Sequence, residues 1–428
     1  MIHGDVAPGF ETIADAFERG HTGDSGGAQL CVYQGGSRVV DLWTGSDPET
    51  GVAIDGDSLF VLWSTTKGMI AIIAAMLIEE GQLAPDRLVS DVWPEFGVGG
   101  KGQTTVAHLL SHAGGLPFFP SAAGIESRDL PNWERCIEAL ATAEPLWEPG
   151  TASWYHPFTF GYLNGEVIRR VTGTSLRELF AERIAGPLGV DFWIGGLPAD
   201  RETDVTHRNR IQPLPATGPA ELWSQHGVDL SDPVVRELLQ EVQSIPDMVE
   251  FLNTPEAHQM EFGGAGGIAS ARSVAKVYAA TIGQVDSIRL LSQQTLDLVT
   301  RPRTLDLGPI PQLATAPNQK LAEFGLGFWL GSQFPSGRFA SGGTFGHPGA
   351  GGNIAFAHPE STIAVSYTCT GMWEDDTQLD PRMGWAEPLA VLAGAALDDD
   401  VRQGPASVSR FRFQPSPENP TKRNALGD

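Results

Sequence analysis

The sequence is poor in residues that would indicate a disulfide-bonded or metal-binding protein. Its only cysteines are Cys31, Cys136 and Cys369, which are odd in number and widely spaced. This pattern offers neither a disulfide framework nor the paired spacing of a zinc site. We therefore expect reduced cysteines in the core, and a protein that uses no metal and no organic cofactor.

Positive charge is also scarce. The chain has 28 lysines and arginines against 52 aspartates and glutamates, which gives a net charge of −24 and an isoelectric point near 4.7. No basic stripe is present, so nucleic acids and anionic membrane surfaces are poor partners. The excess of acidic residues mainly promotes solubility and says little about function.

From the sequence we expect neither a leader sequence nor a membrane-spanning run. Residues 1–5 have neither the basic nor the apolar region of a signal peptide, so we expect a cytoplasmic protein. The most apolar run, residues 69–78, is too short to cross a bilayer but suits a helix buried on all sides. We expect no membrane association.

The chain does contain an ordered series of short periodic segments. Hydrophobic periodicity predicts helices and strands at both ends of the chain, with helices between them. The predicted strands are Ala28–Gln34, 38–42, 324–330, 353–358 and 362–368, and the predicted helices are 10–19, 69–78, 83–93, 105–110, 164–171, 176–184, 386–397 and one near 233–243. This order predicts an α+β fold: an antiparallel sheet built from both termini, flanked by helices, with a mostly helical region inserted.

Composition suggests where the domains divide. We expect residues 1–62 and 263–397 to form the sheet domain and residues 63–262 to form a helical domain. Within the latter, residues 197–262 are rich in proline and charge, which favours a lid or cap segment. Residues 398–428 are polar and proline-rich and are predicted to be a tail.

The most informative pair of residues is Ser64 and Lys67, directly before the apolar run. Residues i and i+3 of a helix share a face, so Ser64 Oγ and Lys67 Nζ can meet at its first turn. A lysine held in an apolar wall loses hydration as a cation, and its pKa falls from about 10.4 toward neutrality. Such an amine can take the serine proton, which predicts an activated nucleophile.

The same spacing occurs a second time, at Ser273 and Lys276. That copy lies in an ordinary amphipathic helix, in which we expect Lys276 to face water. Ser64 differs from it by the entirely apolar helix that follows and by Trp63, which precedes it. The spacing alone is a weak signal, and these surroundings favour Ser64.

A serine–lysine pair needs a further proton carrier for the leaving group. The best candidate is Tyr155, in a loop bracketed by residues 149–150 (Pro-Gly) and 156–157 (His-Pro). Near Lys67 the phenol is expected to have a pKa below its usual value of about 10 and to act as a general base or acid. The alternative is a buried tyrosine that only donates one hydrogen bond.

Acyl transfer also needs backbone N–H groups to bind the oxyanion. The amide of Ser64 is one candidate. Residues 344–353 are rich in glycine, which lets a backbone approach a ligand closely. Because Pro348 has no N–H, the second donor is Ala350 or Gly349. The alternative reading of this stretch is a glycine-rich turn before a strand.

Three other patterns do not support a site. Residues 23–27 (Gly-Asp-Ser-Gly-Gly) copy the surroundings of a trypsin-like nucleophile, but the required upstream histidine and aspartate are missing, so we expect a turn. His108 and His112 lie at i, i+4 without the glutamate or third ligand of a zinc site. Residues 263–267 lack the strand and lysine of a phosphate loop, which indicates a hinge or tight crossover.

Taken in chain order, four motifs resemble those of the serine β-lactamase-like superfamily: residues 64–67, residues 109–117, Tyr155 and residues 347–349. The sequence is most similar to family VIII carboxylesterases, which are relatives of class C β-lactamases and penicillin-binding D,D-peptidases. The resemblance covers roughly residues 10–397, and the shared order makes it far more specific than any single motif.

The resemblance implies a role for each matching residue. It implies that Ser64 is the nucleophile, that Lys67 and Tyr155 are the proton-transfer pair, and that the strand around Ala350 is the oxyanion wall. It also implies the fold of that superfamily.

The departures from the family pattern bear on the substrate. Penicillin-recognising relatives carry Tyr-x-Asn, whereas this chain has Pro157 at the asparagine position, and they carry Lys-Thr-Gly where this chain has His347, Pro348 and Gly349. Each lost charge-assisted contact removes about 1.5–3 kcal/mol from the binding of an anionic amide. The imidazole of His347 need not be charged at pH 7. A neutral ester suffers no such loss.

Aromatic and glycine residues near these motifs are candidates for substrate binding. Trp63 and Trp154 can line an apolar pocket, although aromatic residues beside a core helix are more often plain packing. His347 can shape the alcohol side of the pocket, and Gly349 can let the backbone approach the substrate.

The sequence therefore predicts a serine hydrolase that cleaves small-molecule carboxylic esters through an acyl-enzyme. Other readings stay open: an acyltransferase, a β-lactamase or D-aminopeptidase-type amide hydrolase, and a catalytically silent binding protein of the same fold. Homo-oligomerisation is left open.

Overall fold

The computed structural model describes most of the chain between its first residue and residue 394. The described ranges are 1–24, 26–208, 224, 227–236, 248–308, 310–313, 323–331, 343–371 and 380–394. The tail predicted for residues 398–428 and most of the helix predicted near 233–243 lie outside these ranges. The division into a sheet domain and a helical domain stays a prediction.

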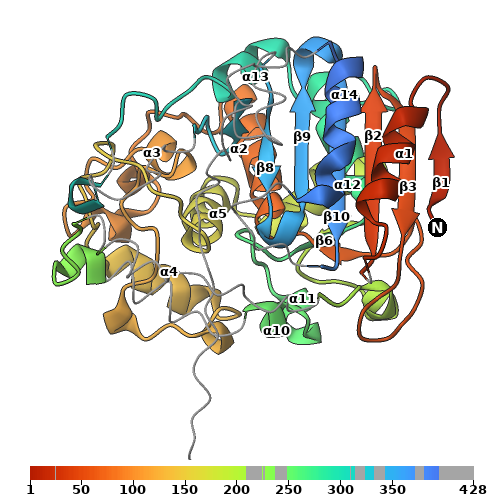
Figure 1. The fold of residues 1–428 in the computed structure, drawn as a ribbon. Helices are drawn as coiled ribbons and strands as arrows, with labels where there is room; N and C mark the ends of the chain where they lie inside the picture. The colour runs from red at the N-terminus through yellow and green to blue at the C-terminus, as the bar shows by residue number, and fades with distance from the viewer. Residues whose placement is uncertain are drawn as a thin grey trace, which may run out of the picture.

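The centre of the fold is a seven-stranded sheet in the order β1-β3-β2-β10-β9-β8-β7, with antiparallel pairing throughout. Its strands are β1 (His3–Val6), β2 (Ala28–Gln34), β3 (Ser37–Thr44), β7 (Trp329–Leu330), β8 (Phe345–Pro348), β9 (Ile354–His358) and β10 (Ile363–Cys369). Pairing of β2 with β10 joins the N-terminal and C-terminal strands, which lie side by side in Figure 1. The predicted α+β fold with a sheet built from both termini is confirmed.

Side-chain alternation along β2 explains why helices cover both faces of the sheet. Successive residues of a strand point to opposite faces. Leu30 and Val32 pack with residues of α1 and α14, whereas Cys31 and Tyr33 belong to the core cluster that contains α12. In Figure 1, α1 (Glu11–Gly20) and α14 (Ala386–Leu392) lie in front of the sheet and α12 (Ala271–Ile282) lies behind it.

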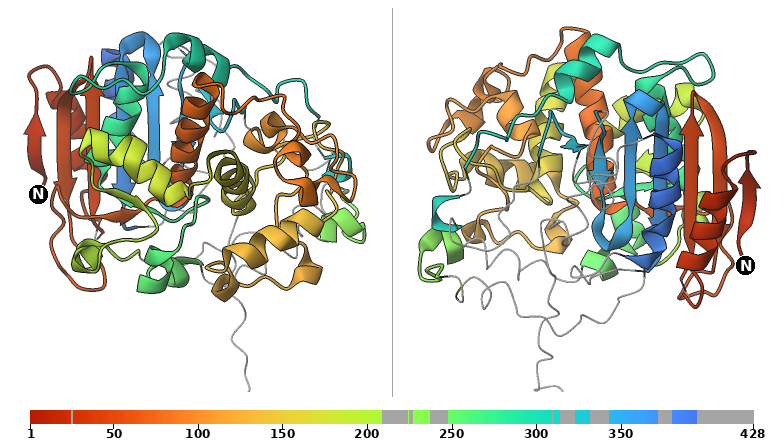
Figure 2. Two further views of the ribbon diagram at one scale, coloured as in Figure 1. Left: turned by 180° about the vertical axis from the view of Figure 1, so that it is seen from behind. Right: turned by 45° about the horizontal axis from the view of Figure 1, so that its top comes forward.

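The remaining helices lie mostly beyond the β8 side of the sheet, but those of residues 176–188 lie behind the sheet, on the side of α12 (Figures 1 and 2). They are α2 (Lys67–Glu79), α3 (Val106–Leu110), α4 (Trp133–Thr142), α5 (Thr159–Thr172), α6 (Leu176–Phe180), α7 (Gly186–Leu188), α10 (Met248–Leu252), α11 (Pro255–Gln259) and α13 (Gln293–Val299). None of the helices in the described part of the chain combines the length and apolar character needed to cross a membrane.

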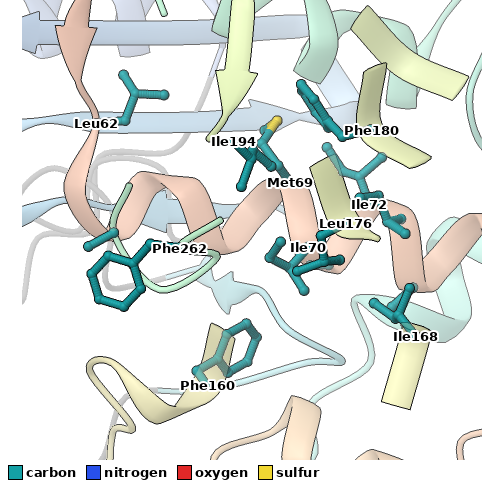
Figure 3. Packing of buried hydrophobic residues seen from close by; sticks show 14 of the residues in the cluster. Leu62, Met69, Ile70, Ile72, Phe160, Ile168, Leu176, Phe180, Ile194 and Phe262 are labelled. Atoms are coloured by element: carbon teal, nitrogen blue, oxygen red, sulfur yellow. The ribbon is translucent and has the colours of Figure 1, made fainter. Parts of the chain in front are cut away.

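Helix α2 runs between the sheet and the helical region, in contact with β8 and α5. Its residues from Lys67 to Ala75, and Leu77, are buried, so the prediction of a helix buried on all sides is confirmed. Figure 3 shows side chains of α2 surrounded by residues from several other elements, namely Phe160, Ile168, Leu176, Phe180, Ile194 and Phe262. This packing fixes the helix that carries Lys67.

A second, three-stranded sheet lies just before the serine. It has the order β4-β6-β5 and consists of β4 (Phe60–Val61), β6 (Gly267–Ala269) and β5 (Phe192–Ile194). Pairing of β4 with β6 brings the segment before Ser64 against residues 267–269, which directly follow the glycine-rich stretch. The sequence did not predict these strands, because two or three residues are too few to show a period.

Two predicted elements are wrong. Residues 83–93 contain only a short 3₁₀ turn, Val89–Asp91, because Leu88 pairs with Thr105 as an isolated β-bridge. The strand predicted over 324–330 is reduced to Trp329–Leu330, since Gly327 has a φ of +86° and the chain turns there.

Candidate active site

Ser64 and Lys67 lie side by side at the junction of two helical segments. Ser64 is on a 3₁₀ turn, Trp63–Thr66, that leads directly into α2. Lys67 Nζ lies 3.1 Å from Ser64 Oγ and donates a hydrogen bond to the carbonyl oxygen of Gly264 at 2.6 Å. The meeting of the two side chains follows the i, i+3 spacing of the sequence.

The amine of Lys67 is fully buried. Burial lowers the pKa of Lys67 well below its usual value, because the charged form loses its hydration. The direction of this shift is the one that the apolar surroundings predict. A neutral amine 3.1 Å from a serine hydroxyl is able to accept its proton.

The loop between α4 and α5 brings Tyr155 to the same place. Its phenol hydrogen-bonds the side chain of Ser64, and Lys67 Nζ lies 5.0 Å from the centre of its ring. The pKa expected for Tyr155 was wrong in direction. Burial raises the pKa of this phenol, and its hydrogen bond with Ser64 offsets that only in part. A neutral Lys67 provides no positive charge that would stabilise the phenolate.

His112 supports the Tyr155 loop. Its imidazole ring lies 4.9 Å from the ring of Tyr155, 4.8 Å from that of Phe160 and 4.3 Å from that of Phe324, measured between centres. His112 Nδ1 accepts a hydrogen bond from the His156 amide at 3.0 Å. Burial lowers the pKa of His112 well below its usual value, so the ring is neutral. From the sequence, we considered His112 as a metal ligand and as part of the 109–117 motif, but did not predict its contact with Tyr155.

His108 and His112 do not converge on a common point. His108 Nδ1 accepts a hydrogen bond from the Thr105 amide and so caps α3. In the part of the chain that the structure describes, no group of three or more histidine, cysteine, aspartate or glutamate side chains is placed to hold a metal ion.

The end of β8 packs against the Ser64 turn. A Cβ placed on Gly349 would lie 2.5 Å from the carbonyl oxygen of Leu62 and 2.8 Å from Thr65 Oγ1, so only glycine allows this approach. Ala350 follows at the start of a 3₁₀ turn, Ala350–Gly352. The structure therefore places both residues that were considered as oxyanion donors next to the segment that carries Ser64.

Residues 263–267 form a tight crossover. The sequence had predicted either a hinge or a tight crossover for this glycine-rich stretch. A Cβ on Gly161 of α5 would collide with the Gly264 amide. The Gly267 amide donates to Thr66 Oγ1 at 2.9 Å, and its carbonyl accepts from the Leu62 amide at 2.8 Å. The glycines therefore let the chain pass close to the Ser64 turn, where the Gly264 carbonyl contacts Lys67. No sequence pattern indicates that contact.

Sequence comparison assigns the family. The sequence model of the β-lactamase family matches residues 13–385, which is most of the chain. The protein belongs to the β-lactamase family. The resemblance to the serine β-lactamase-like superfamily that the motifs carry is thereby confirmed.

Named relatives of this family member include both esterases and penicillin-binding proteins. LipL of Mycobacterium tuberculosis, named an esterase/beta-lactamase, is 31% identical over 372 residues, which cover 85% of this chain and 82% of LipL. A solved family VIII carboxylesterase has 32% identity and a TM-score of 0.75, covering 92% of this chain and 100% of its own. A penicillin-binding protein homologue from Caulobacter crescentus has 31% identity and a TM-score of 0.76, with the same coverage.

The two positions at which the sequence departs from the penicillin-recognising pattern are both buried. Pro157 is buried in the turn before α5 and has no amide side chain. His347 is fully buried, and its Nδ1 lies 2.6 Å from the carbonyl oxygen of Pro348. Burial lowers the pKa of His347 well below its usual value, so it adds no positive charge.

The two tryptophans predicted to bind substrate lie in different apolar clusters. Trp63 is only 2% exposed and belongs to the large core that surrounds α2. Trp154 is partly buried against a smaller cluster that includes Phe118 and Trp147. Plain packing was the alternative to substrate binding in the sequence analysis of both residues. Contact of Trp63, Trp154, His347 and Gly349 with substrate stays a prediction.

The second serine–lysine pair is engaged elsewhere. Lys276 Nζ lies 2.7 Å from an Asp286 carboxylate oxygen and donates to the Leu188 carbonyl at 2.7 Å. Its side chain is 18% exposed, so the expectation that it faces water is wrong. Ser273 Oγ pairs with Ser270 Oγ at the start of α12. Lys276 therefore bonds Asp286 and Leu188, and Ser273 bonds Ser270, so no contact between Ser273 and Lys276 resembles that between Ser64 and Lys67.

Proposed function

We propose that the protein hydrolyses carboxylic esters of small molecules through an acyl-enzyme on Ser64. The observation that carries this proposal is the buried amine of Lys67, 3.1 Å from Ser64 Oγ, with the phenol of Tyr155 hydrogen-bonded to the same serine. The relatives named esterase and carboxylesterase support this activity.

In the acylation step, Ser64 Oγ attacks the ester carbonyl carbon while neutral Lys67 accepts the hydroxyl proton. The new ammonium keeps its hydrogen bond to the Gly264 carbonyl, which partly replaces lost hydration. As the bond between the carbonyl carbon and the alkoxy oxygen breaks, Tyr155 gives its proton to the departing alcohol. Lys67 then returns a proton to Tyr155, so the pair ends neutral.

Deacylation reverses the same proton path. Water attacks the acyl carbonyl carbon, and its proton passes to the Lys67–Tyr155 pair. The bond between the carbonyl carbon and Ser64 Oγ breaks, Ser64 recovers a proton, and the carboxylic acid leaves. In both steps the amides of Ser64 and Ala350 bind the negative oxygen of the tetrahedral intermediate.

The proposed preference for esters follows from the polar groups near the site. A β-lactam or peptide substrate carries a carboxylate and an acylamino group that need charge-assisted partners. Pro157 offers no donor, and a neutral His347 offers no charge. An uncharged ester loses nothing from either difference, so we expect ester turnover to exceed β-lactam turnover.

The test compares two substrates and two serines. Purified protein is assayed with p-nitrophenyl butyrate and with nitrocefin, alongside Ser64→Ala and the control Ser273→Ala. We expect ester turnover that is lost in Ser64→Ala and kept in Ser273→Ala, with weak nitrocefin turnover. Strong nitrocefin turnover would indicate a β-lactamase. Turnover kept in Ser64→Ala would refute the proposed nucleophile.

Labelling identifies the reactive serine directly. After reaction with a fluorophosphonate, mass spectrometry of peptides should find the label on Ser64 and none on Ser25 or Ser273. Absence of both label and turnover would favour a catalytically silent binding protein. Added alcohols that divert product from acid to a new ester would show acyl transfer.

A further inference from the structure

The turn that carries Ala350 rests on a buried arginine from a distant part of the sequence. Arg208 lies within the segment predicted as a cap, and its side chain is buried. Its Nη1 donates to the carbonyl oxygen of Ala350 at 2.6 Å. Its Nη2 donates to Asn353 Oδ1 at 2.6 Å and to the Cys369 carbonyl at 2.8 Å. One guanidinium therefore binds three oxygen acceptors around the turn.

Asn353 extends this contact to the strand that precedes the serine. Its Nδ2 donates to the carbonyl of Val61, on β4, at 3.1 Å. Its Oδ1 accepts from Arg208 and also from the Cys369 amide at 3.1 Å. Arg208 and Asn353 together thus connect the Ala350 turn, the end of β10 and the strand that leads to Ser64.

The backbone of Arg208 is itself held on both sides. The Arg208 amide donates to Asn253 Oδ1, and Asn253 Nδ2 donates back to the Arg208 carbonyl, each at 3.1 Å. Two residues earlier, the Thr206 amide donates to the Leu59 carbonyl at 2.8 Å. The base from which the guanidinium reaches the turn is therefore fixed.

The Ala350 turn contains two glycines with positive φ and is also contacted by a second arginine. Gly351 and Gly352 have φ values of +75° and +107°. Arg382 Nη2 donates to the Gly351 carbonyl at 3.4 Å, and its guanidinium is paired with Asp380. The two arginines hold successive carbonyls of this short turn.

We propose that Arg208 is a positioning residue for the oxyanion: by holding the carbonyl side of Ala350 and the side chain of Asn353, it fixes where residue 350, and with it the N–H of the preceding peptide bond, lies relative to the Ser64 amide. This inference rests on the proposed function. The two amides come from segments far apart in sequence, and such constellations must be held within about 0.5 Å to be productive. The planar fork of arginine can bind several oxygens at fixed angles, whereas lysine offers a single point charge.

The experiment uses Arg208→Lys and Arg208→Gln in the full-length protein, with Arg272→Lys as a matched control. Arg272 is also partly buried and bonded by its guanidinium, to Asp41 and Asp57, but it lies on α12 outside the site. Each variant is assayed with p-nitrophenyl butyrate, with rates divided by the number of serines that a fluorophosphonate titrates to completion. This division removes any effect of a partly unfolded sample.

We expect kcat to fall by about tenfold to a hundredfold in both Arg208 variants, somewhat less than the loss of a whole oxyanion donor, with KM within about twofold. A trifluoromethyl ketone, which forms a tetrahedral adduct with an oxyanion, should lose affinity by the same factor as kcat. The control should keep wild-type kcat and inhibitor affinity. If Arg208 had a merely structural role, its substitution would lower the melting temperature without equal losses of kcat and ketone affinity.

The inference is overturned if kcat and ketone affinity stay within about twofold of wild type, or if only KM changes. Should both Arg208 variants fail to fold, Asn253→Ala takes their place, because it loosens the Arg208 backbone and leaves the guanidinium intact. It is expected to lower kcat and ketone affinity in parallel, and no change in either would refute the inference. Wild-type protein without Ser64-dependent ester turnover would instead refute the proposed function itself.

Discussion

Gly68 lies directly against the phenol of Tyr278, one residue beyond the lysine that contacts Ser64. A Cβ at Gly68 would overlap the Tyr278 hydroxyl oxygen. The hydroxyl is at the end of a rigid, fully buried side chain of α12. The first turn of α2 can therefore approach α12 this closely only because residue 68 is glycine.

Substitution of Gly68 by alanine should displace the start of α2. Overpacking of a core costs about 1–3 kcal/mol, and the shift would move Lys67 Nζ away from Ser64 Oγ. We expect Gly68→Ala to lower both the free energy of unfolding, measured in urea, and the kcat for an ester. Loss of kcat should exceed what the unfolded fraction explains.

A second substitution checks the cause. In Tyr278→Phe the oxygen is gone, and the nearest ring carbon would be 3.1 Å from the added Cβ. The hydroxyl has no hydrogen-bond partner among the described residues, so its removal alone should leave stability unchanged or raised. The double variant Gly68→Ala/Tyr278→Phe is expected to recover most of the lost stability. Purely additive effects of the two substitutions would contradict a direct collision.

The buried amine of Lys67 should make stability depend on pH. Its pKa is lowered in the folded protein and ordinary, about 10.4, in the unfolded chain. Between these two pKa values the unfolded chain binds more protons than the folded protein. The free energy of unfolding therefore rises with pH up to about 10.4, and it decreases as the pH falls toward the folded pKa. Lys67→Met removes this contribution. Denaturant unfolding of both proteins at pH 7 and pH 9.5 should show wild type gaining relative to the variant.

The pH dependence of the reaction separates the two proton carriers. Lys67 must be neutral to accept the serine proton, so kcat/KM should rise with pH through its lowered pKa. Burial raises the pKa of Tyr155 above the usual tyrosine value, so no falling limb from this phenol is expected below about pH 10. A bell-shaped profile with a fall at neutral pH would contradict this assignment.

Removal of the Tyr155 hydroxyl tests the same step by mutation. The ring of Tyr155 stacks with Phe324 at 6.4 Å, and phenylalanine can keep that contact. General acid–base groups typically contribute about 10²–10⁴-fold, so Tyr155→Phe should lose that much kcat with KM and melting temperature nearly unchanged. An active Tyr155→Phe would leave Lys67 as the sole proton carrier.

Features encoded by local pattern were predictable. The largely apolar run of β2 and the longer apolar run of α2 are each visible within one element. The meeting of Ser64 with Lys67 needs only helical spacing and burial. Local patterns of this kind therefore suffice to predict the sheet, the buried helix and the centre of the site.

Features that depend on distant segments were not predictable. The carbonyl of Gly264 reaches Lys67 because two glycine-containing segments cross, and no local signal indicates which oxygen ends there. The raised pKa of Tyr155 follows from desolvation, which the sequence cannot quantify. Arg208 lies in a stretch without a clear period, so its contact with the Ala350 turn became visible only in three dimensions.

His112 offers a test of how the Tyr155 loop is held. Its φ is +60°, a conformation that asparagine tolerates better than alanine. His112→Asn keeps this backbone and an acceptor for the His156 amide but removes the ring that packs against Tyr155. His112→Ala removes both and adds strain. We expect kcat to fall by about tenfold in the asparagine variant and further in the alanine variant, because small displacements of a catalytic group can cost up to about 10²-fold. Equal losses in both, measured by steady-state ester hydrolysis, would show that the aromatic contact alone orients Tyr155 and that the hydrogen bond to His156 does not.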